Sequence, residues 1–237
     1  MAKRTDAATL SRFIRDELRD NILSGRWEPG DRLQLKQLSD QFDTSSTVLR
    51  EALARLAAER LVVLKPNRGF FVPTLSLDEL RYITELRIVN ERFGVELALE
   101  RGDLTWEGDL IAAHHRMERT ERRDKDNRPT AEWAEAHQAF HTQLIAACGV
   151  PVLIDFTNTL SDLVQLYNRW ATQSTNWTGR DLSSEHDAIL QAALDRDAQK
   201  TGDLLTQHYR GTLEAITKLG IEAGVPQAIP DAAEKLA

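Results

Sequence analysis

Between residues 78 and 219 the sequence is a succession of helical segments without a strand pattern, and this stretch constrains the fold most. Apolar residues recur at spacings of three and four, which is typical of amphipathic helices. Breaks at glycine, proline or acidic residues divide the stretch into helices at about 78–101, 105–126, 130–148, 151–172, 183–195 and 198–219. Helices of this number and length predict an antiparallel bundle with an interior large enough for a ligand.

Composition excludes several other classes of protein. The 237 residues are enough for two domains, and 41% hydrophobic with 28% charged residues is typical of a globular chain. The sequence contains no run of about 18 apolar residues, so no transmembrane helix is expected. The basic N-terminus lacks the apolar segment of a secretory signal. The single cysteine, Cys148, excludes an intrachain disulfide and a cysteine-based zinc motif. We therefore expect a cytoplasmic protein without a membrane partner.

The net charge of −7 is unevenly distributed along the chain. Residues 1–73 carry a net charge of +3, and the remaining residues carry −10. A mildly basic first part followed by an acidic second part fits a nucleic-acid-binding module joined to a domain with another role.

The stretch from Thr44 to Glu59 predicts a short helix with two chemically different faces. Its apolar residues fall on one stripe at helical spacing, which predicts a buried face. Ser46, Thr47 and Arg50 lie together on another face, at spacings of three and four. Hydroxyl and guanidinium groups on the first turns of a helix suit contact with phosphates and with base edges. We therefore interpret this helix as one that reads DNA.

The segments around this helix complete a winged helix-turn-helix. Residues 8–24 and 35–42 show helical periodicity, and a tight turn joins the second of these helices to the third. Apolar runs at 61–64 and 70–72, separated by turn residues, predict a small β-hairpin. A helix-turn-helix at about 34–53 followed by such a wing predicts a DNA-binding domain.

The order of these elements, with the run TSSTVLREAL at residues 44–53, resembles the winged-helix domain of the GntR family of bacterial transcription regulators over about residues 8–73. The resemblance implies DNA contacts from the second and third helices and from the tip of the wing. The implied contact residues are Lys36, Ser45, Ser46, Thr47, Arg50, Arg68 and Gly69.

Three positions depart from the usual family sequence. Ser46 stands where arginine is usual, Val48 replaces a proline, and Arg60 replaces a common glycine. The missing arginine removes a group that could bind a base or a phosphate through two hydrogen bonds, so we expect a base preference different from the family average. Considered alone, the helix allows a second interpretation, in which Arg50 is solvated or paired with Glu51.

The histidines all lie in the predicted bundle, at His114, His115, His137, His141, His186 and His208. His137 and His141 are four residues apart, so their imidazoles project from one helix face about 6 Å apart and could share a metal ion. Adjacent helical residues point about 100° apart, so His114 and His115 are expected to be a solvated pair.

The second part of the chain resembles the all-helical FCD effector domain that often follows the GntR head. The matching elements are His137-Gln-Ala-Phe-His141, Glu185-His186, and Asp197 with His208 eleven residues later. In that domain an aspartate and three histidines bind a divalent metal, which implies His141, His186 and His208 as ligands here. His137 stands where the family has aspartate. As a fourth ligand it would favour Zn²⁺ over oxygen-preferring ions, with Ni²⁺ or Mn²⁺ as alternatives.

One further residue is implied by the same resemblance. Arg87 lies where the FCD domain often has an arginine near the effector cavity, and it could bind a carboxylate through two hydrogen bonds. The alternative is an ordinary helix-surface ion pair with Glu91, four residues later.

The sequence thus predicts a mainly α protein with a winged helix-turn-helix domain at 8–73, an FCD-like effector and dimerisation bundle at 78–222, and a flexible tail at 223–237. The expected function is that of a homodimeric transcription regulator, in the family's commoner sense a repressor, acting on a metabolic operon. It would bind a near-palindromic double-stranded operator and sense a small carboxylate that is coordinated to the bundle metal.

Two other functions stay open on the sequence alone. The first is a DNA-binding protein whose bundle is only a structural dimerisation scaffold. The second is a hydrolase with a histidine-bound metal, for which Glu185 is the single candidate general base.

Overall fold

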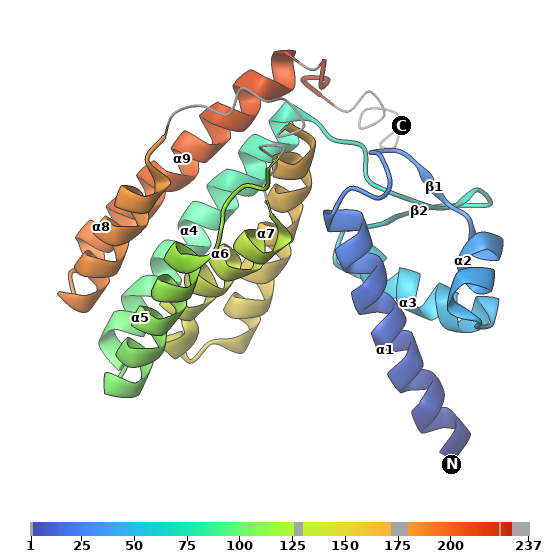
Figure 1. Cartoon of the computed structure of the whole chain (residues 1–237), viewed down its shortest axis with the longest axis horizontal. Helices are drawn as coiled ribbons and strands as arrows, with labels where there is room; N and C mark the ends of the chain where they lie inside the picture. Colours follow the sequence, from blue (N-terminus) through green and yellow to red (C-terminus); the bar gives the residue numbers. More distant parts are fainter. Residues whose placement is uncertain (1, 126–129, 172–179, 223, 229–237) are drawn as a thin grey trace, which may run out of the picture. The chain divides into compact units, whose positions relative to one another are not determined.

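The computed structural model describes residues 2–125, 130–171, 180–222 and 224–228. The chain forms two compact units, which comprise residues 1–75 and residues 76–228 (Figure 1). Most of the tail that the sequence predicts to be flexible, residues 223–237, lies outside the described residues.

The first unit contains three helices and a small sheet. Its elements are α1 (Ala2–Leu23), β1 (Arg32–Leu33), α2 (Leu35–Phe42), α3 (Ser46–Ala58), β2 (Val63–Lys65) and β3 (Gly69–Phe71). Ile14 and Leu18 of α1 and Leu49, Leu53 and Leu56 of α3 are fully buried, because each helix turns its apolar stripe inward. The stripe predicted in α3 is therefore the core of this unit.

The turn between α2 and α3 is set by two residues. Asp43 ends α2 in the left-handed conformation, with φ of 45°, and its backbone N–H donates to the carbonyl of Ser39. The Ser45 side chain accepts a hydrogen bond from the backbone N–H of Val48 at 3.4 Å, so α3 begins at Ser46. The helix-turn-helix predicted from the sequence is confirmed, with α3 starting two residues later than expected.

The wing is a three-stranded antiparallel sheet in the order β1-β3-β2. Leu64 of β2 pairs with Phe70 of β3, as expected for a hairpin. The additional strand, β1, pairs Arg32 with Phe71 and Leu33 with Phe70. Two residues are too few to show strand periodicity, which is why the sequence predicted only the hairpin.

The second unit is a bundle of six long helices, counted over the described residues. They are α4 (Leu77–Arg101), α5 (Leu104–Arg119), α6 (Ala131–Leu144), α7 (Pro151–Ala171), α8 (Leu182–Leu194) and α9 (Ala198–Glu222), with a short 3₁₀ helix at Ala146–Cys148. Side chains at the N-caps accept backbone N–H bonds and start four of these helices. The capping residues are Ser76, Asp103, Thr130 and Asp181.

Two bundle helices end earlier than the sequence predicts. Helix α5 stops at Arg119 and not near residue 126, and α6 stops at Leu144 before the 3₁₀ turn.

In the bundle, α4 runs beside α9 (Figure 1), and α6 packs against α5. A continuous core of buried apolar side chains, including Val95, Leu110 and Phe140, joins the helices. Among the described residues, no helix is both long enough and apolar enough to cross a bilayer.

Candidate metal centre and DNA-binding surface

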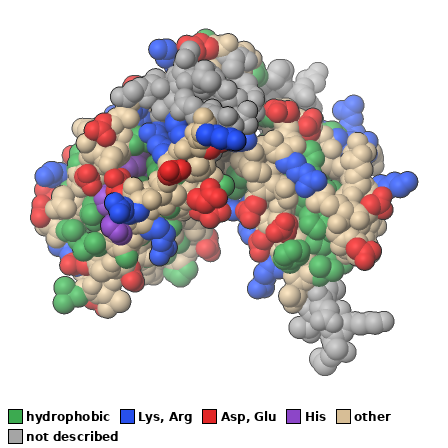
Figure 2. All heavy atoms as spheres, viewed as in Figure 1, with side chains coloured by type: hydrophobic (Ala, Val, Ile, Leu, Met, Phe, Trp, Pro, Cys, Tyr) green, Lys and Arg blue, Asp and Glu red, His purple; other side chains and the backbone are tan. Residues whose placement is uncertain are grey.

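Three bundle helices bring four histidines together. His137 and His141 come from α6, His186 from α8 and His208 from α9, and one ring nitrogen of each lies within 4.8 Å of the others. His141, His186 and His208 are buried, and His137 is half-buried. On the face of the bundle drawn in Figure 2, histidine shows as one small patch beside Lys or Arg side chains.

The spacing of the two α6 imidazoles suits one metal ion. The Nε2 atoms of His137 and His141 are 3.2 Å apart. Two nitrogens bound at 2.0–2.1 Å to one tetrahedral Zn²⁺ lie about 3.3 Å from each other. Successive turns of α6 therefore present two ligand nitrogens at the separation that a shared metal ion requires.

In His208 and His141, the ring nitrogen Nδ1 is held by a carboxylate and by a phenol, respectively. His208 Nδ1 donates to Glu185 Oε2 at 2.8 Å. His141 Nδ1 lies 3.0 Å from the hydroxyl oxygen of Tyr209, and that hydroxyl donates to Glu91. The phenol proton is thus committed, so His141 donates through Nδ1 and its Nε2 is left without a proton. Partners of this kind fix the tautomer that presents Nε2 to a metal.

His186 gives the clearest sign that the cluster fits a cation. Its imidazole hydrogen-bonds the backbone of Leu182, one turn earlier in α8. Its Nε2 is buried and has no hydrogen-bond partner in the described part of the chain. An unpaired buried polar atom is costly, and a cation at the centre of the four histidines would satisfy it. The residues present therefore fit a divalent metal.

The protonation state of the cluster is also suitable for ligation. Burial lowers the pKa of His137 and His141 well below the ordinary imidazole value, and neighbouring positive groups add to the effect. Burial lowers the pKa of His186 and His208 as well, although the hydrogen bond to Glu185 partly opposes it in His208. The imidazoles are therefore neutral, which is the form that binds a metal.

Glu185 lies on the outer side of His208. Burial would raise the pKa of this carboxyl group, but hydrogen bonds from His208 and Arg180 outweigh burial and hold the pKa below its usual range. Arg180 donates to it at 3.1 Å from Nε and at 2.5 Å from Nη2. A carboxylate bound in this way orients a histidine and is not placed to act as a general base at the metal. The hydrolase interpretation thus loses its one candidate base.

Arg87 is buried, with 6% of its surface exposed. Its Nε donates to Glu91 Oε1 at 2.9 Å, and its guanidinium lies 4.2 Å above the ring of Tyr209. The ion pair that the sequence suggested as an alternative therefore exists, but it lies in the bundle interior and not on the helix surface. Contacts from Arg87 through Glu91 and Tyr209 reach His141. The roles of Glu91 and Tyr209 were missed, although Tyr209 directly follows a predicted ligand.

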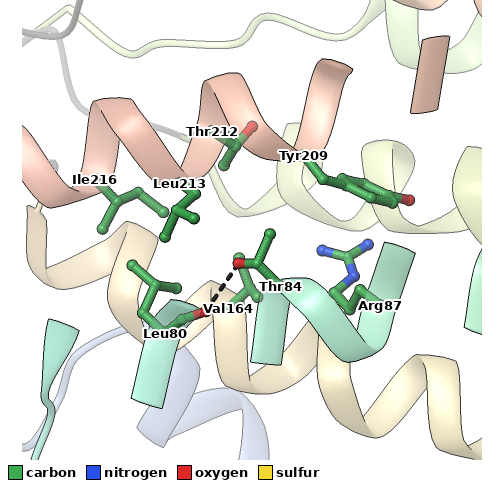
Figure 3. Close-up of a pocket in the computed structure, with 8 residues that line it drawn as sticks. All are labelled: Leu80, Thr84, Arg87, Val164, Tyr209, Thr212, Leu213 and Ile216. Atoms are coloured by element: carbon green, nitrogen blue, oxygen red, sulfur yellow. Dashed lines mark hydrogen bonds between the residues drawn. The ribbon is translucent and has the colours of Figure 1, made fainter. Parts of the chain in front are cut away.

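A small pocket lies on the other side of Tyr209, between α4, α7 and α9 (Figure 3). Its free volume is about 10 Å³, which is room for about one water molecule. The side chains that line it are Leu80, Thr84, Arg87, Val164, Tyr209, Thr212, Leu213 and Ile216.

The prediction that His114 and His115 are both solvated is wrong for one of them. His115 is exposed, but His114 is buried, with its ring packed edge-on against Phe140 at 5.3 Å between centroids. Its Nε2 lies 3.3 Å from Asp187 Oδ1. Because adjacent residues diverge by about 100°, one histidine of the pair faces the packed side of α5 while the other faces water. Neither belongs to the cluster.

The residues predicted to contact DNA lie on the surface of the first unit. Lys36, Ser45, Ser46, Thr47, Arg50 and Arg68 are exposed, and Gly69 is partly exposed with φ of +100°, a conformation that favours glycine at the wing tip.

Arg50 makes no ion pair within the described ranges, and Glu51 is paired with Arg55 at 2.8 Å. The interpretation that pairs Arg50 with Glu51 is therefore wrong. Arg32 of β1, which the sequence did not single out, lies beside Gly69 and adds a positive charge at the wing.

Fold and site together define a winged helix-turn-helix DNA-binding unit joined to a helical bundle with a histidine cluster. Residues 10–72 match the family model of the bacterial regulatory proteins, gntR family, and residues 82–211 match that of the FCD domain. The chain belongs to the GntR family and carries an FCD domain.

Known relatives agree with this assignment. The chain is 33% identical over 194 residues to the HTH-type transcriptional repressor GlaR of Escherichia coli (strain K12), covering 81% of this chain and 88% of GlaR. It is 31% identical over 206 residues to the HTH-type transcriptional regulator BphR of Paraburkholderia xenovorans (strain LB400), covering 86% and 84%. The solved structure of E. coli McbR/YncC has the same fold, with a TM-score of 0.74, 19% identity and coverage of 88% and 97%. The family and these relatives are transcriptional regulators that bind DNA, not enzymes.

Proposed function

We propose that this chain is a homodimeric, cytoplasmic repressor whose helical domain holds a divalent metal and senses a small organic acid. The observation that carries the proposal is the buried Nε2 of His186. This atom lies among the imidazoles of the cluster and has no hydrogen-bond partner within the described residues. The name of the relative GlaR supports the repressor sense.

The metal would be held by His137, His141, His186 and His208. Zn²⁺ is the first choice because nitrogen donors suit it, and four protein donors are the number in its closed sites. When bound, the ion supplies positive charge to the bundle interior and links α6, α8 and α9. Glu185 and Tyr209 hold His208 and His141 in the ligating tautomer.

Operator binding would use the exposed polar face of the head. Arg50 is free to reach base edges, while Lys36, Arg68 and Arg32 suit phosphates. Ser46 and Thr47 offer hydroxyl groups. At position 46 the family usually has an arginine. Ser45 acts first as the N-cap of α3.

Dimerisation would use an exposed apolar face of α4. Its large side chains repeat at spacings of four, three and four, and the face continues onto α7: Tyr82, Leu86, Val89 and Phe93, with Val152 and Phe156. An apolar face of this kind marks an interface. Along its edge the charges alternate in sign, at Arg81, Glu85, Arg92 and Glu96. Two α4 helices packed antiparallel about a two-fold axis would therefore place unlike charges opposite each other.

The dimer surface is tested by Val89→Glu, with Leu104→Glu as the matched control, because both side chains are highly exposed on bundle helices. A buried glutamate at the centre of the apolar face is expected to give monomers by light scattering at about 10 µM. Leu104 lies outside the face, so its variant should stay dimeric. Equal masses for the two variants would remove α4 from the interface.

The effector would act by binding one arrangement of the protein better than the other, which is the requirement for any allosteric ligand. Arg87 and the proposed metal are cationic groups in the bundle interior that would attract an anion.

The whole proposal is tested by metal analysis and melting curves of the purified chain. We expect about one metal ion per chain, a lower melting temperature in EDTA, and recovery with Zn²⁺. A carboxylate panel should then raise the melting temperature and weaken operator binding. A chain without stoichiometric metal, whose melting ignores EDTA, would contradict the metal site. If no carboxylate changed the melting temperature or operator binding, the bundle would be a purely structural domain.

A further inference from the structure

The first turn of α4 is held by groups from other parts of the bundle, and the ends of α7 and α9 lie beside it (Figure 1). Backbone N–H groups at a helix start have no partner within the helix, so other groups must satisfy them. The Ser76 side chain accepts from the backbone N–H of Glu79 at 3.1 Å, as an N-cap does. The backbone N–H of Ser76 donates in turn to the hydroxyl of Tyr167 on α7 at 3.2 Å, and that hydroxyl donates to the Glu79 carboxylate.

Two further N–H groups of this turn are bound by the segment Val225–Gln227, which we call the strap. The backbone N–H groups of Leu77 and Asp78 donate to the carbonyls of Pro226 at 3.2 Å and Gln227 at 2.9 Å. The side-chain amide of Gln227 also donates to the Asp78 carboxylate at 2.8 Å. The strap therefore binds the start of α4 through both its backbone and a side chain.

The strap is packed onto the end of α9. Gly224, with φ of +78°, turns the chain back, and the backbone N–H of Val225 donates to the carbonyl of Gly220 at 2.9 Å. The Val225 side chain is buried. A Cβ placed on Gly220 would lie 2.8 Å from Leu77 Cδ2 and 3.7 Å from Val225 Cγ2, so both of these apolar side chains meet at the glycine. The strap, the end of α9 and the start of α4 thus form one packed cluster.

A short connector joins this cluster to the DNA-binding unit. The last residue fixed within that unit is Val72, whose backbone N–H donates to the carbonyl of Asp31 at 2.9 Å and whose carbonyl accepts from Gly30 at 3.1 Å. Residues 73–75 then lead into α4, and the first of them is Pro73, whose ring fixes its own φ. A connector of this length and stiffness leaves the head little freedom once the first turn of α4 is fixed.

We propose that the strap is a positioning segment for operator binding: by holding the first turn of α4, it sets the half-site spacing that the two heads of a dimer accept. The inference rests on the proposed homodimer, in which each head binds one half-site. Two linked binding modules gain affinity only when their separation matches that of their sites. If the turn were released, each head could leave the bundle in many directions, and fewer of these directions would match one spacing.

Two full-length variants loosen the first turn of α4 in different ways. Val225→Asp places a carboxylate where a side chain is buried beside Leu77, so the strap should detach. Ile221→Asp is the matched control, because it introduces the same side chain four residues earlier, where the isoleucine is 63% exposed. Tyr167→Phe removes the hydroxyl that binds Ser76 but keeps the ring, so it loosens the turn without a new charge.

Fluorescence anisotropy measures binding to three DNAs: an operator that the native protein selects from random-sequence DNA, the same operator with two base pairs inserted between the half-sites, and one half-site alone. The insertion turns one half-site by about 70° around the DNA axis. The native chain and Ile221→Asp are expected to bind the lengthened operator about 100-fold more weakly than the selected one. Val225→Asp and Tyr167→Phe should bind the selected operator about tenfold more weakly than the native chain and lose less on the insertion. All four proteins should bind the single half-site equally.

The outcomes separate two failures. If Val225→Asp and Tyr167→Phe discriminate between the two spacings as strongly as the native chain does, the strap only stabilises the fold, and the inference is wrong while the dimer stands. A lower melting temperature with unchanged discrimination, or equal relaxation in Ile221→Asp, has the same meaning. If the native chain binds the single half-site as tightly as the selected operator, the proposed dimeric binding is itself wrong.

Discussion

The two polar regions of this protein are built in opposite ways. In the head, Lys36, Arg50 and Arg68 are exposed and form no ion pair within the described ranges. In the bundle, Glu185 and Tyr209 hold the outer nitrogens of two buried histidines. Binding to DNA gains from solvated cations that can exchange water and counterions for phosphates. Binding of a metal gains from ligands that are oriented beforehand. Substitutions in the two regions should therefore have separable consequences.

Removal of the metal should have the largest effect on the bundle. An ion that binds only the folded state stabilises it by about 4 kcal/mol when its free concentration is about 1,000 times the Kd. EDTA, or the variant His186→Ala, is expected to lower the melting temperature by about 10 °C. Calorimetry with and without added Zn²⁺ measures this. Equal melting curves would remove the distinction between the two regions, because the cluster would then be no ligand site.

Arg50→Ala should affect the head alone. The loss of one guanidinium at the DNA surface is expected to weaken operator binding by about 1–3 kcal/mol, since its base or phosphate contact disappears. Arg55→Ala is the matched control, because Arg55 is on the same helix but is paired with Glu51. Fluorescence anisotropy at constant salt compares the two, and metal content should stay unchanged in both. If both variants lost affinity equally, the effect would be one of charge and not of position.

Glu185→Gln tests whether the bundle site is oriented by its surroundings. The amide cannot replace the charged acceptor at His208 Nδ1, so metal affinity is expected to fall by about 10–100-fold. Competition with a chromogenic chelator measures this affinity. Asp187→Asn makes the same change two residues away, on an exposed side chain outside the cluster, and should bind metal normally. Unchanged affinity in Glu185→Gln would show that the ligands orient themselves.

The sequence predicted the parts of the fold that depend on neighbours along the chain. Helical periodicity and breaks at glycine, proline or acidic residues placed the helices, because these signals act within a few residues. Strand β1 was missed because its two residues are held by β3, which lies nearly 40 residues later.

The histidine cluster shows the same division between local and distant information. Resemblance implied His141, His186 and His208 as ligands, and helical spacing added His137, but neither identified the groups that hold these histidines. Glu91 and Tyr209 are separated by 118 positions, and only the packing of α4 against α9 brings them together. The burial of Arg87 and of His114 likewise depends on which side of each helix is covered by other helices of the bundle.

The smallest effect is expected at Arg60, where the family often has glycine. Arg60 follows α3 with φ of 63°, and the backbone N–H groups of Arg60 and Leu61 donate to the carbonyls of Ala57 and Leu56. This is a Schellman ending, whose left-handed residue is usually glycine because a Cβ is strained there. Arg60→Gly is therefore expected to stabilise the head by about 0.5–1 kcal/mol.

The matched control for that change is Arg60→Ala, which removes the charge but keeps the Cβ. It should gain no stability, so the pair separates backbone strain from the loss of an exposed cation. Chemical denaturation followed by far-UV circular dichroism measures the gain. Metal affinity of the bundle should not respond to either variant. Equal stabilisation by alanine and glycine would show that charge repulsion, and not the left-handed backbone, destabilises the end of α3.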